Sequence, residues 1–139
     1  MTDDIELLKE CDSGVKMGID GIKGVIDKAF NEGLRNMLEN YEEEHVRILD
    51  TIRGKLGEAG MDVKEPHPIA KFNLKVTTDI KMAVNDSDEK IANIMMDGCN
   101  MGIKSVSMYM NQYAGASKET MDIANSIVTL EKNFGFSSN

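Results

Sequence analysis

The stretch Tyr41-Glu42-Glu43-Glu44-His45 lies in the middle of the strongest helical pattern of this 139-residue chain and holds one of its two histidines. Glu42 and His45 are three residues apart, so on a helix their side chains point to the same side. A carboxylate and an imidazole placed in this way form either half of a metal site or two polar residues at the edge of a core. The choice between these two interpretations governs what function the chain can have.

Around this stretch, apolar residues recur every three or four positions over residues 33–58, as on the buried side of an amphipathic helix. The same spacing predicts helices over residues 3–30, 68–84, 88–113 and 118–134, with the last helix ending at Gly135, and no segment alternates with a period of two. Short turns join 3–30 to 33–58 and 88–113 to 118–134, so each pair forms an antiparallel hairpin. The sequence therefore predicts one all-α domain over residues 1–139, an antiparallel four-helix bundle with one additional short helix in the long crossover connection.

Composition excludes several classes of partner. The net charge is −8, which is unfavourable for binding to nucleic acid or to an anionic membrane surface. No apolar run reaches the length of a membrane span. We therefore expect no nucleic-acid partner and no membrane partner. Cys11 and Cys99 are the only cysteines and make no disulfide framework, so we expect a cytoplasmic protein.

Glycines line one side of the first predicted helix, at Gly14, Gly18 and Gly21. Each costs a helix about 1 kcal/mol relative to alanine. Either a neighbouring helix approaches closely along this side, or the glycines are tolerated in a helix that packing holds in place.

A short internal match adds to the hairpin arrangement. Residues 11–16 and 99–104 share the pattern Cys-x-x-Gly-(Val/Ile)-Lys, and each copy lies on the first helix of its own hairpin. An internal duplication would place Cys11 and Cys99 at related positions about a pseudo-twofold axis.

Four parts of the chain together resemble the ferritin-like domains, and within them the rubrerythrin-related bacterial group of unknown function. These parts are residues 7–14 (Leu-Leu-Lys-Glu-Cys-Asp-Ser-Gly), the Tyr41–His45 stretch, the inserted helix over 68–84, and Asp97-Gly98-Cys99. The resemblance covers nearly the whole chain and implies a ferritin-like antiparallel four-helix bundle, in which one long connection joins the two hairpins.

Metal-binding members of this family use one Glu on each of two helices and a Glu-x-x-His on each of the other two. By this resemblance Glu42 and His45 match one Glu-x-x-His, and Asp12 stands where the first helix would carry its Glu. Cys99 takes the corresponding place on the third bundle helix, and it is not a hard ligand.

The last helix offers Glu131, but Phe134 stands where its histidine should be. With at least two ligands missing, we do not expect a two-metal centre or the oxidase, ferroxidase or peroxidase chemistry that it supports.

The remaining polar residues allow three interpretations. The first is a rebuilt site for a single zinc or iron ion, with ligands drawn from Glu42, His45, Cys99, Cys11 and Asp12. In the second, both cysteines pack as small hydrophobic residues and His45 hydrogen-bonds to Tyr41, a carboxylate or a water. We favour the second, because cysteine and histidine occur in cores far more often than they bind metal. The third is a Cys11–Cys99 disulfide formed under oxidation, which requires Cα atoms within about 7 Å.

Three methionines, Met96, Met101 and Met108, fall off the buried stripe of the helix over 88–113 and predict a dimer interface. We expect a homo-oligomer, a dimer or larger, that is not catalytic. It would act through assembly in stress response or metal handling and retain a degenerate metal site. The alternative is a metal-binding protein or enzyme with a rebuilt Cys/His/carboxylate site in the bundle core.

Overall fold

The computed structural model describes residues 2–61 and 88–137, and the helices below belong to those ranges. The helices are α1 (Thr2–Val25), the short 3-10 helix η1 (Ile26–Lys28), α2 (Glu32–Glu58), α4 (Asp88–Gln112) and α5 (Lys118–Ser137). These ranges contain no strand, so the predicted all-α class is confirmed for them. The helix predicted over 68–84 lies outside the described residues.

Two helix ends differ from the prediction. The first α-helix ends at Val25 and its last predicted turn is the 3-10 helix η1. The last helix does not end at Gly135, because it continues to Ser137. Glycine is compatible with helical backbone angles, and its cost of about 1 kcal/mol is small beside the packing of the adjacent Phe134 in the core.

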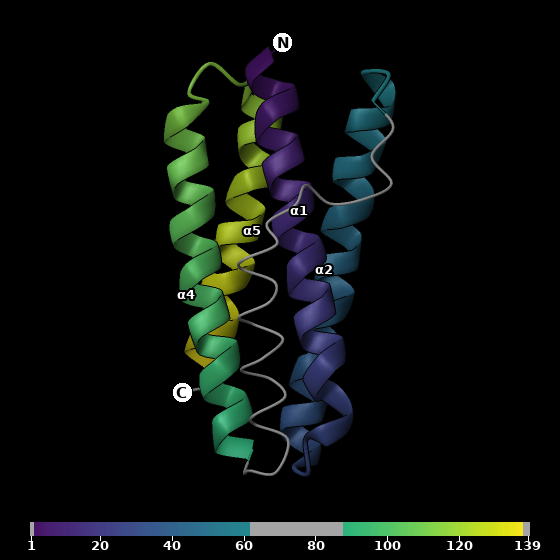
Figure 1. Ribbon diagram of the computed structural model, residues 1–139, viewed down its shortest axis with the longest axis vertical. Helices are drawn as coiled ribbons and strands as arrows, with labels where there is room; N and C mark the ends of the chain where they lie inside the picture. The colour runs from purple at the N-terminus through teal and green to yellow at the C-terminus, as the bar shows by residue number, and fades with distance from the viewer. Residues whose placement is uncertain (1, 62–87, 138–139) are drawn as a thin grey trace.

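The four long helices form a bundle of two hairpins, α1 with α2 and α4 with α5 (Figure 1). Helix α1 packs against both α2 and α4, and α5 packs against the same two helices. The two helices of each of these pairs run in opposite directions (Figure 1). Helix α2 ends beside the start of α1, whereas α4 begins at the opposite end of the bundle. Helices α2 and α4 therefore run in the same direction.

Carboxylates of α1 join the two hairpins at one end of the bundle. Asp3 accepts a hydrogen bond from the backbone N–H of Gly115 at 2.9 Å, and Asp4 accepts one from the backbone N–H of Ser117 at 2.5 Å. A side chain at position 115 would meet the Asp3 carboxylate, since a Cβ there would lie 2.6 Å from its Oδ2. The α4–α5 turn is thus held against the N-terminus of α1.

The other end of the bundle is joined through Asp88, the first residue of α4. Its two carboxylate oxygens accept hydrogen bonds from the backbone N–H groups of Phe30 and Asn31, at 2.8 and 2.7 Å. Asn31 in turn caps α2, because its side-chain oxygen accepts from the backbone N–H of Leu34 at 2.9 Å. The two hairpins are therefore held together at both ends by charged or polar caps.

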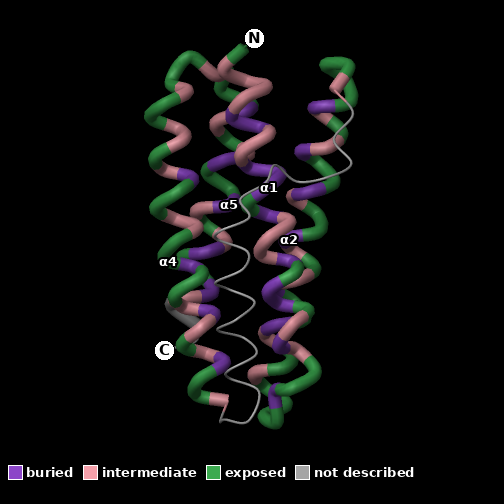
Figure 2. Tube along the Cα trace, viewed as in Figure 1, coloured by how far each residue is buried: buried purple, intermediate pink, exposed green. Residues whose placement is uncertain are grey.

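Buried residues recur at intervals along all four long helices (Figure 2). They divide into two clusters, and we call them the first and second core clusters. The first includes Leu7, Cys11, Ile52 and Leu56, and the second includes Ile22, Leu38, Cys99 and Phe134. The two cysteines thus lie in separate parts of the core. No helix of the described residues is long and apolar enough to cross a membrane.

Candidate functional site

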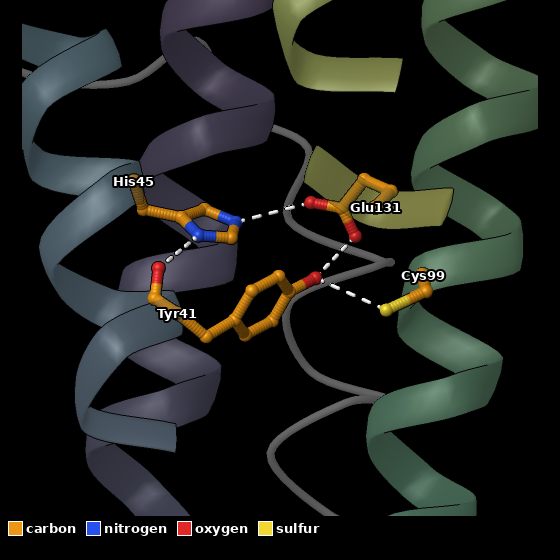
Figure 3. Close-up of polar contacts among 4 residues, drawn as sticks. All are labelled: Tyr41, His45, Cys99 and Glu131. Carbon is orange, nitrogen blue, oxygen red and sulfur yellow. Dashed lines mark hydrogen bonds and ion pairs between the residues drawn. The ribbon is translucent and has the colours of Figure 1, made fainter. Parts of the chain in front are cut away.

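Four polar side chains from three helices meet inside the bundle, and we call them the polar cluster. They are Tyr41 and His45 of α2, Cys99 of α4 and Glu131 of α5 (Figure 3). Their residues are 6%, 2%, 1% and 5% exposed, so each polar group depends on a protein partner in place of bulk water.

Helix α2 places two of these side chains next to each other. Tyr41 and His45 are four residues apart and therefore lie on the same side of the helix. Their rings meet edge to face, with centroids 4.3 Å apart and planes at 83°. The Nδ1 atom of His45 lies 2.7 Å from the backbone carbonyl oxygen of Tyr41, which fixes the ring orientation.

Glu131 connects α2 to the second hairpin. Its Oε1 lies 3.1 Å from Nε2 of His45, and its Oε2 accepts a hydrogen bond from the Tyr41 hydroxyl. The same hydroxyl lies 3.1 Å from Sγ of Cys99. Every polar side chain of the cluster therefore has a hydrogen-bonding partner within the cluster, as buried polar groups require.

Gly18 and the ring of Phe134 border the polar cluster. A Cβ at Gly18 of α1 would lie 2.7 Å from Nε2 of His45, closer than side-chain atoms approach one another. Phe134 stacks on Tyr41, with ring centroids 4.0 Å apart and planes at 22°. The close approach predicted along the glycine side of α1 is confirmed at Gly18. At Gly14 a Cβ would meet no atom within 4 Å, so the other interpretation fits there, a glycine tolerated without a close neighbour.

Burial keeps the Tyr41 and Cys99 groups protonated. Loss of water, followed by the charge of Glu131, raises the pKa of the Tyr41 phenol far above its usual range. The same two causes, in the same order, raise the pKa of the Cys99 thiol to about 12. Because the thiolate is the nucleophile, the Cys99 thiol is unreactive at neutral pH as it stands in this core.

Asp12 lies elsewhere in the core. Its carboxylate is fully buried, and Oδ2 accepts a hydrogen bond from Nε of Arg53 at 3.1 Å. Oδ1 of Asp12 and Nη2 of Arg53 are buried without a hydrogen-bond partner. Arg53 follows His45 by eight residues on α2, about 12 Å along the helix. Asp12 is therefore about two helical turns away from the polar cluster.

Cys11 is also separate from the polar cluster. It packs among the apolar residues of the first core cluster, whereas Cys99 belongs to the second. Burial, followed by the charges of Glu10 and Asp12, raises the pKa of its thiol to about 12. Both cysteines are free thiols.

Of the five predicted metal ligands, the structure brings together only His45 and Cys99. Glu42 is half-buried and takes no part in the polar cluster, and Asp12 and Cys11 lie further along the bundle. Within residues 2–61 and 88–137, no group of three or more His, Cys, Asp and Glu side chains is arranged to hold a metal ion. The rebuilt metal site stays a prediction. The expected hydrogen bond between His45 and Tyr41 is present, through the Tyr41 carbonyl, and a carboxylate, Glu131, lies 3.1 Å from Nε2 of His45.

Glu131 and Tyr41 are the cluster residues missing from the predicted site. The signal for Glu131 was its spacing, because it follows Ile127 by four residues and precedes Phe134 by three, and both are buried. A carboxylate on that side of an amphipathic helix faces the core and needs a partner.

No family model matches this chain, and no curated protein matches it. Among solved structures, the fold is similar to one described as the crystal structure of a DUF305 fragment from Deinococcus radiodurans, with a TM-score of 0.79. The two are 10% identical in sequence, and the match covers 99% of this chain and 93% of that chain. The structural likeness shows that the two proteins share a helical fold. At this low sequence identity it carries no information about activity.

Proposed function

We propose that this protein is a ferritin-like helical bundle that acts without catalysis, through assembly into a dimer or larger homo-oligomer, in stress response or metal handling. The parallel course of α2 and α4 supports the ferritin-like assignment, since a bundle of two such hairpins needs one long connection. Two buried free thiols fit a reducing compartment such as the cytoplasm.

The observation that carries the non-catalytic proposal is that the polar cluster satisfies itself. Tyr41 donates a hydrogen bond to Glu131, Nε2 of His45 lies 3.1 Å from the same carboxylate, and Tyr41 also contacts Cys99. Each group that could bind a substrate or an ion already has a partner, so the cluster acts as a polar connection between the two hairpins.

The residues present do not fit a two-metal carboxylate centre. Such a centre takes four carboxylates and two histidines from four helices. The polar cluster contains one of each, Glu131 and His45, while Gly18 faces the cluster from α1 and Phe134 from α5. We therefore derive no oxidative chemistry for this protein.

One observation favours the alternative of a single-ion site for zinc or iron. The Nδ1 atom of His45 is bonded to a backbone carbonyl, which is the arrangement that leaves Nε2 available to a metal in many metalloproteins. Glu131 and Cys99 would be the other ligands, in place of Glu42, Cys11 and Asp12, and all three side chains would have to move, since they are not arranged around an ion as they stand. This alternative requires loss of the hydrogen bonds within the cluster.

Elemental analysis of protein purified without chelator separates the two proposals. We expect zinc and iron well below one equivalent, before and after anaerobic reconstitution with each ion. One equivalent of metal that is lost in Cys99→Ser but kept in Cys11→Ser would replace the first proposal by the second. Cys11 is a matched control because it is equally buried but belongs to the other core cluster.

Sedimentation velocity tests the assembly. Met101 and Met108 are 38% and 53% exposed and lie seven residues apart, on one side of α4, which fits the predicted interface. Met96, five residues before Met101, is half-buried on the same helix but does not share that side. We expect Met101→Lys with Met108→Lys to dissociate the oligomer and Val46→Lys, an equally exposed apolar site on α2, to leave it intact. A monomeric wild-type protein contradicts the assembly proposal.

A further inference from the structure

The side of α4 that faces away from the core carries two methionines and two charged residues in one row. They are Asp97, Met101, Lys104 and Met108, all of them exposed, and we call them the outer row. Intervals of four, three and four residues place them on one side of the helix. The buried residues of α4 lie on the opposite side, at Ile91, Met95, Cys99 and Val106. Alternating intervals of three and four are the pattern along which two helices pack lengthwise.

Within residues 2–61 and 88–137, neither charge of the outer row takes part in an ion pair or a side-chain hydrogen bond. Asp97 and Lys104 are seven residues apart, about 10 Å along the helix, which is too far for them to bond to each other. Other exposed lysines, such as Lys16 and Lys118, pair with an aspartate four residues further on. The outer row therefore presents one negative and one positive charge to solvent.

These two charges discriminate between the ways in which two copies of the row can meet about a twofold axis. In a parallel pair, Asp97 would face Asp97 of the partner subunit and Lys104 would face its own counterpart, so like charges would repel. In an antiparallel pair centred midway between the two methionines, the two copies of Lys104 would lie side by side at the axis. An antiparallel pair centred beside Met101 instead places Asp97 of each copy opposite Lys104 of the other.

The overall charge of the chain strengthens this selection. Each chain carries −8, so two copies repel one another at long range. The pair centred beside Met101 sets Lys104 against a carboxylate twice, at two places about 10 Å apart, because the axis generates one contact from the other. The two Met101 side chains meet between these contacts, and methionine adapts its shape to its neighbours.

We propose that two copies of this chain pair through the outer row of α4 in this antiparallel way, with Asp97 of each copy against Lys104 of the other and Met101 at the twofold axis. The pairing rests on the assembly proposed above, and it gives that assembly its partner surface and its geometry. Both copies use the same surface, so the contact closes on itself as a dimer. Met108 then lies at the level of Ile94 of the partner subunit, a half-buried apolar residue.

Charge reversal tests the pairing. Asp97→Lys gives the outer row two lysines and Lys104→Asp gives it two aspartates, so each variant opposes like charges at both contacts. Sedimentation velocity, at a protein concentration where the wild type is dimeric, should show each variant as a monomer with unchanged helical circular dichroism. Arg47→Asp is the matched control, because it changes the net charge as Lys104→Asp does, but on the exposed surface of α2. This control should stay dimeric.

A mixture of the two variants gives the decisive result. Asp97→Lys presents only lysines and Lys104→Asp presents only aspartates, so one copy of each can form both ion pairs. Mixing equal amounts should restore the sedimentation coefficient of the wild type. The double variant Asp97→Lys with Lys104→Asp exchanges the two charges and should be dimeric by itself.

Cross-linking locates the axis. Met101→Cys would place two thiols beside the twofold axis, whereas Met108→Cys would place its two thiols about 22 Å apart along the paired helices. A short bis-maleimide should therefore link two copies of Met101→Cys and leave Met108→Cys as single chains. Cys11 and Cys99 are buried thiols, so the wild type should not be linked.

The outcomes separate failure of the pairing from failure of the assembly. Wild-type sedimentation of either single variant, or monomers in the mixture, would show that the copies meet elsewhere or in another orientation, and would leave the proposed assembly standing. Linkage of Met108→Cys without linkage of Met101→Cys would refute the position of the axis. A monomeric wild type would overturn the pairing and the assembly together.

Discussion

Replacing Gly18 with alanine tests whether the polar cluster depends on the space that α1 leaves for it. The new Cβ would lie 2.7 Å from Nε2 and 2.8 Å from Cδ2 of His45, and the ring is held in place by its bond to the Tyr41 carbonyl. To accept the methyl group, the ring must move and lengthen its contact with Glu131. Overpacking of this kind costs about 1–3 kcal/mol, and leaving a buried polar group without its partner costs about 1–3 kcal/mol more.

Helix propensity acts in the opposite direction. Alanine is better than glycine inside a helix by about 1 kcal/mol. We therefore expect Gly18→Ala to lower the free energy of unfolding by about 1–5 kcal/mol, measured by equilibrium urea unfolding with helical circular dichroism as the signal.

Gly14→Ala is the matched control, one helical turn earlier on α1. It adds the same methyl group where nothing lies within 4 Å, so it should raise the free energy of unfolding by up to about 1 kcal/mol. Combining Gly18→Ala with His45→Ala should remove most of the clash, and a double-mutant cycle measures this coupling. If Gly18→Ala is as stable as Gly14→Ala, the packing described here around His45 is wrong.

Four further predictions concern the cluster, the thiols and one turn. Tyr41→Phe removes the hydroxyl that bonds Glu131 and Cys99, and urea unfolding should show a loss of about 1–3 kcal/mol, while no loss would refute the hydrogen-bond assignment. Because the pKa of Cys11 and of Cys99 is raised to about 12, stability should fall as pH rises from about 9 to 12, and replacing either thiol with alanine should reduce that fall. At pH 8 both thiols should react with Ellman's reagent only on unfolding, and rapid reaction of the native protein would contradict their burial. Gly115→Ala should lower the thermal midpoint, because its Cβ would meet the α1 carboxylate that bonds the Gly115 amide; an unchanged midpoint would show that this contact contributes little.

The helices could be predicted from the sequence because their signal is local. Apolar residues spaced by three and four identify α1, α2, α4 and α5, and acidic residues in the first turns mark several of their starts. Gly135 was misleading, since a glycine near a helix end stops the helix only when the backbone turns away there. Periodicity also placed Cys11, His45 and Cys99 correctly on buried sides of their helices.

The composition of the site could not be predicted in the same way. Asp12, Cys11 and His45 all lie on buried stripes, but a stripe gives no position along the bundle axis relative to another helix. Residues 41 and 131 meet across 90 positions of sequence, and which level of α5 faces which level of α2 depends on how the helices pack. The sequence interpretation placed a carboxylate beside His45, and one is present. It did not identify that carboxylate as Glu131.

By itself, then, the sequence determined an all-α chain of long amphipathic helices with buried cysteines and one buried histidine, because helical periodicity is a property of neighbouring residues. Only the tertiary structure decided that Glu131 and Tyr41 surround His45, that Asp12 pairs with Arg53 about two turns away, and that Gly18 makes room for the imidazole ring. The physical reason is the axial register between packed helices, which many side chains set together and no local pattern records.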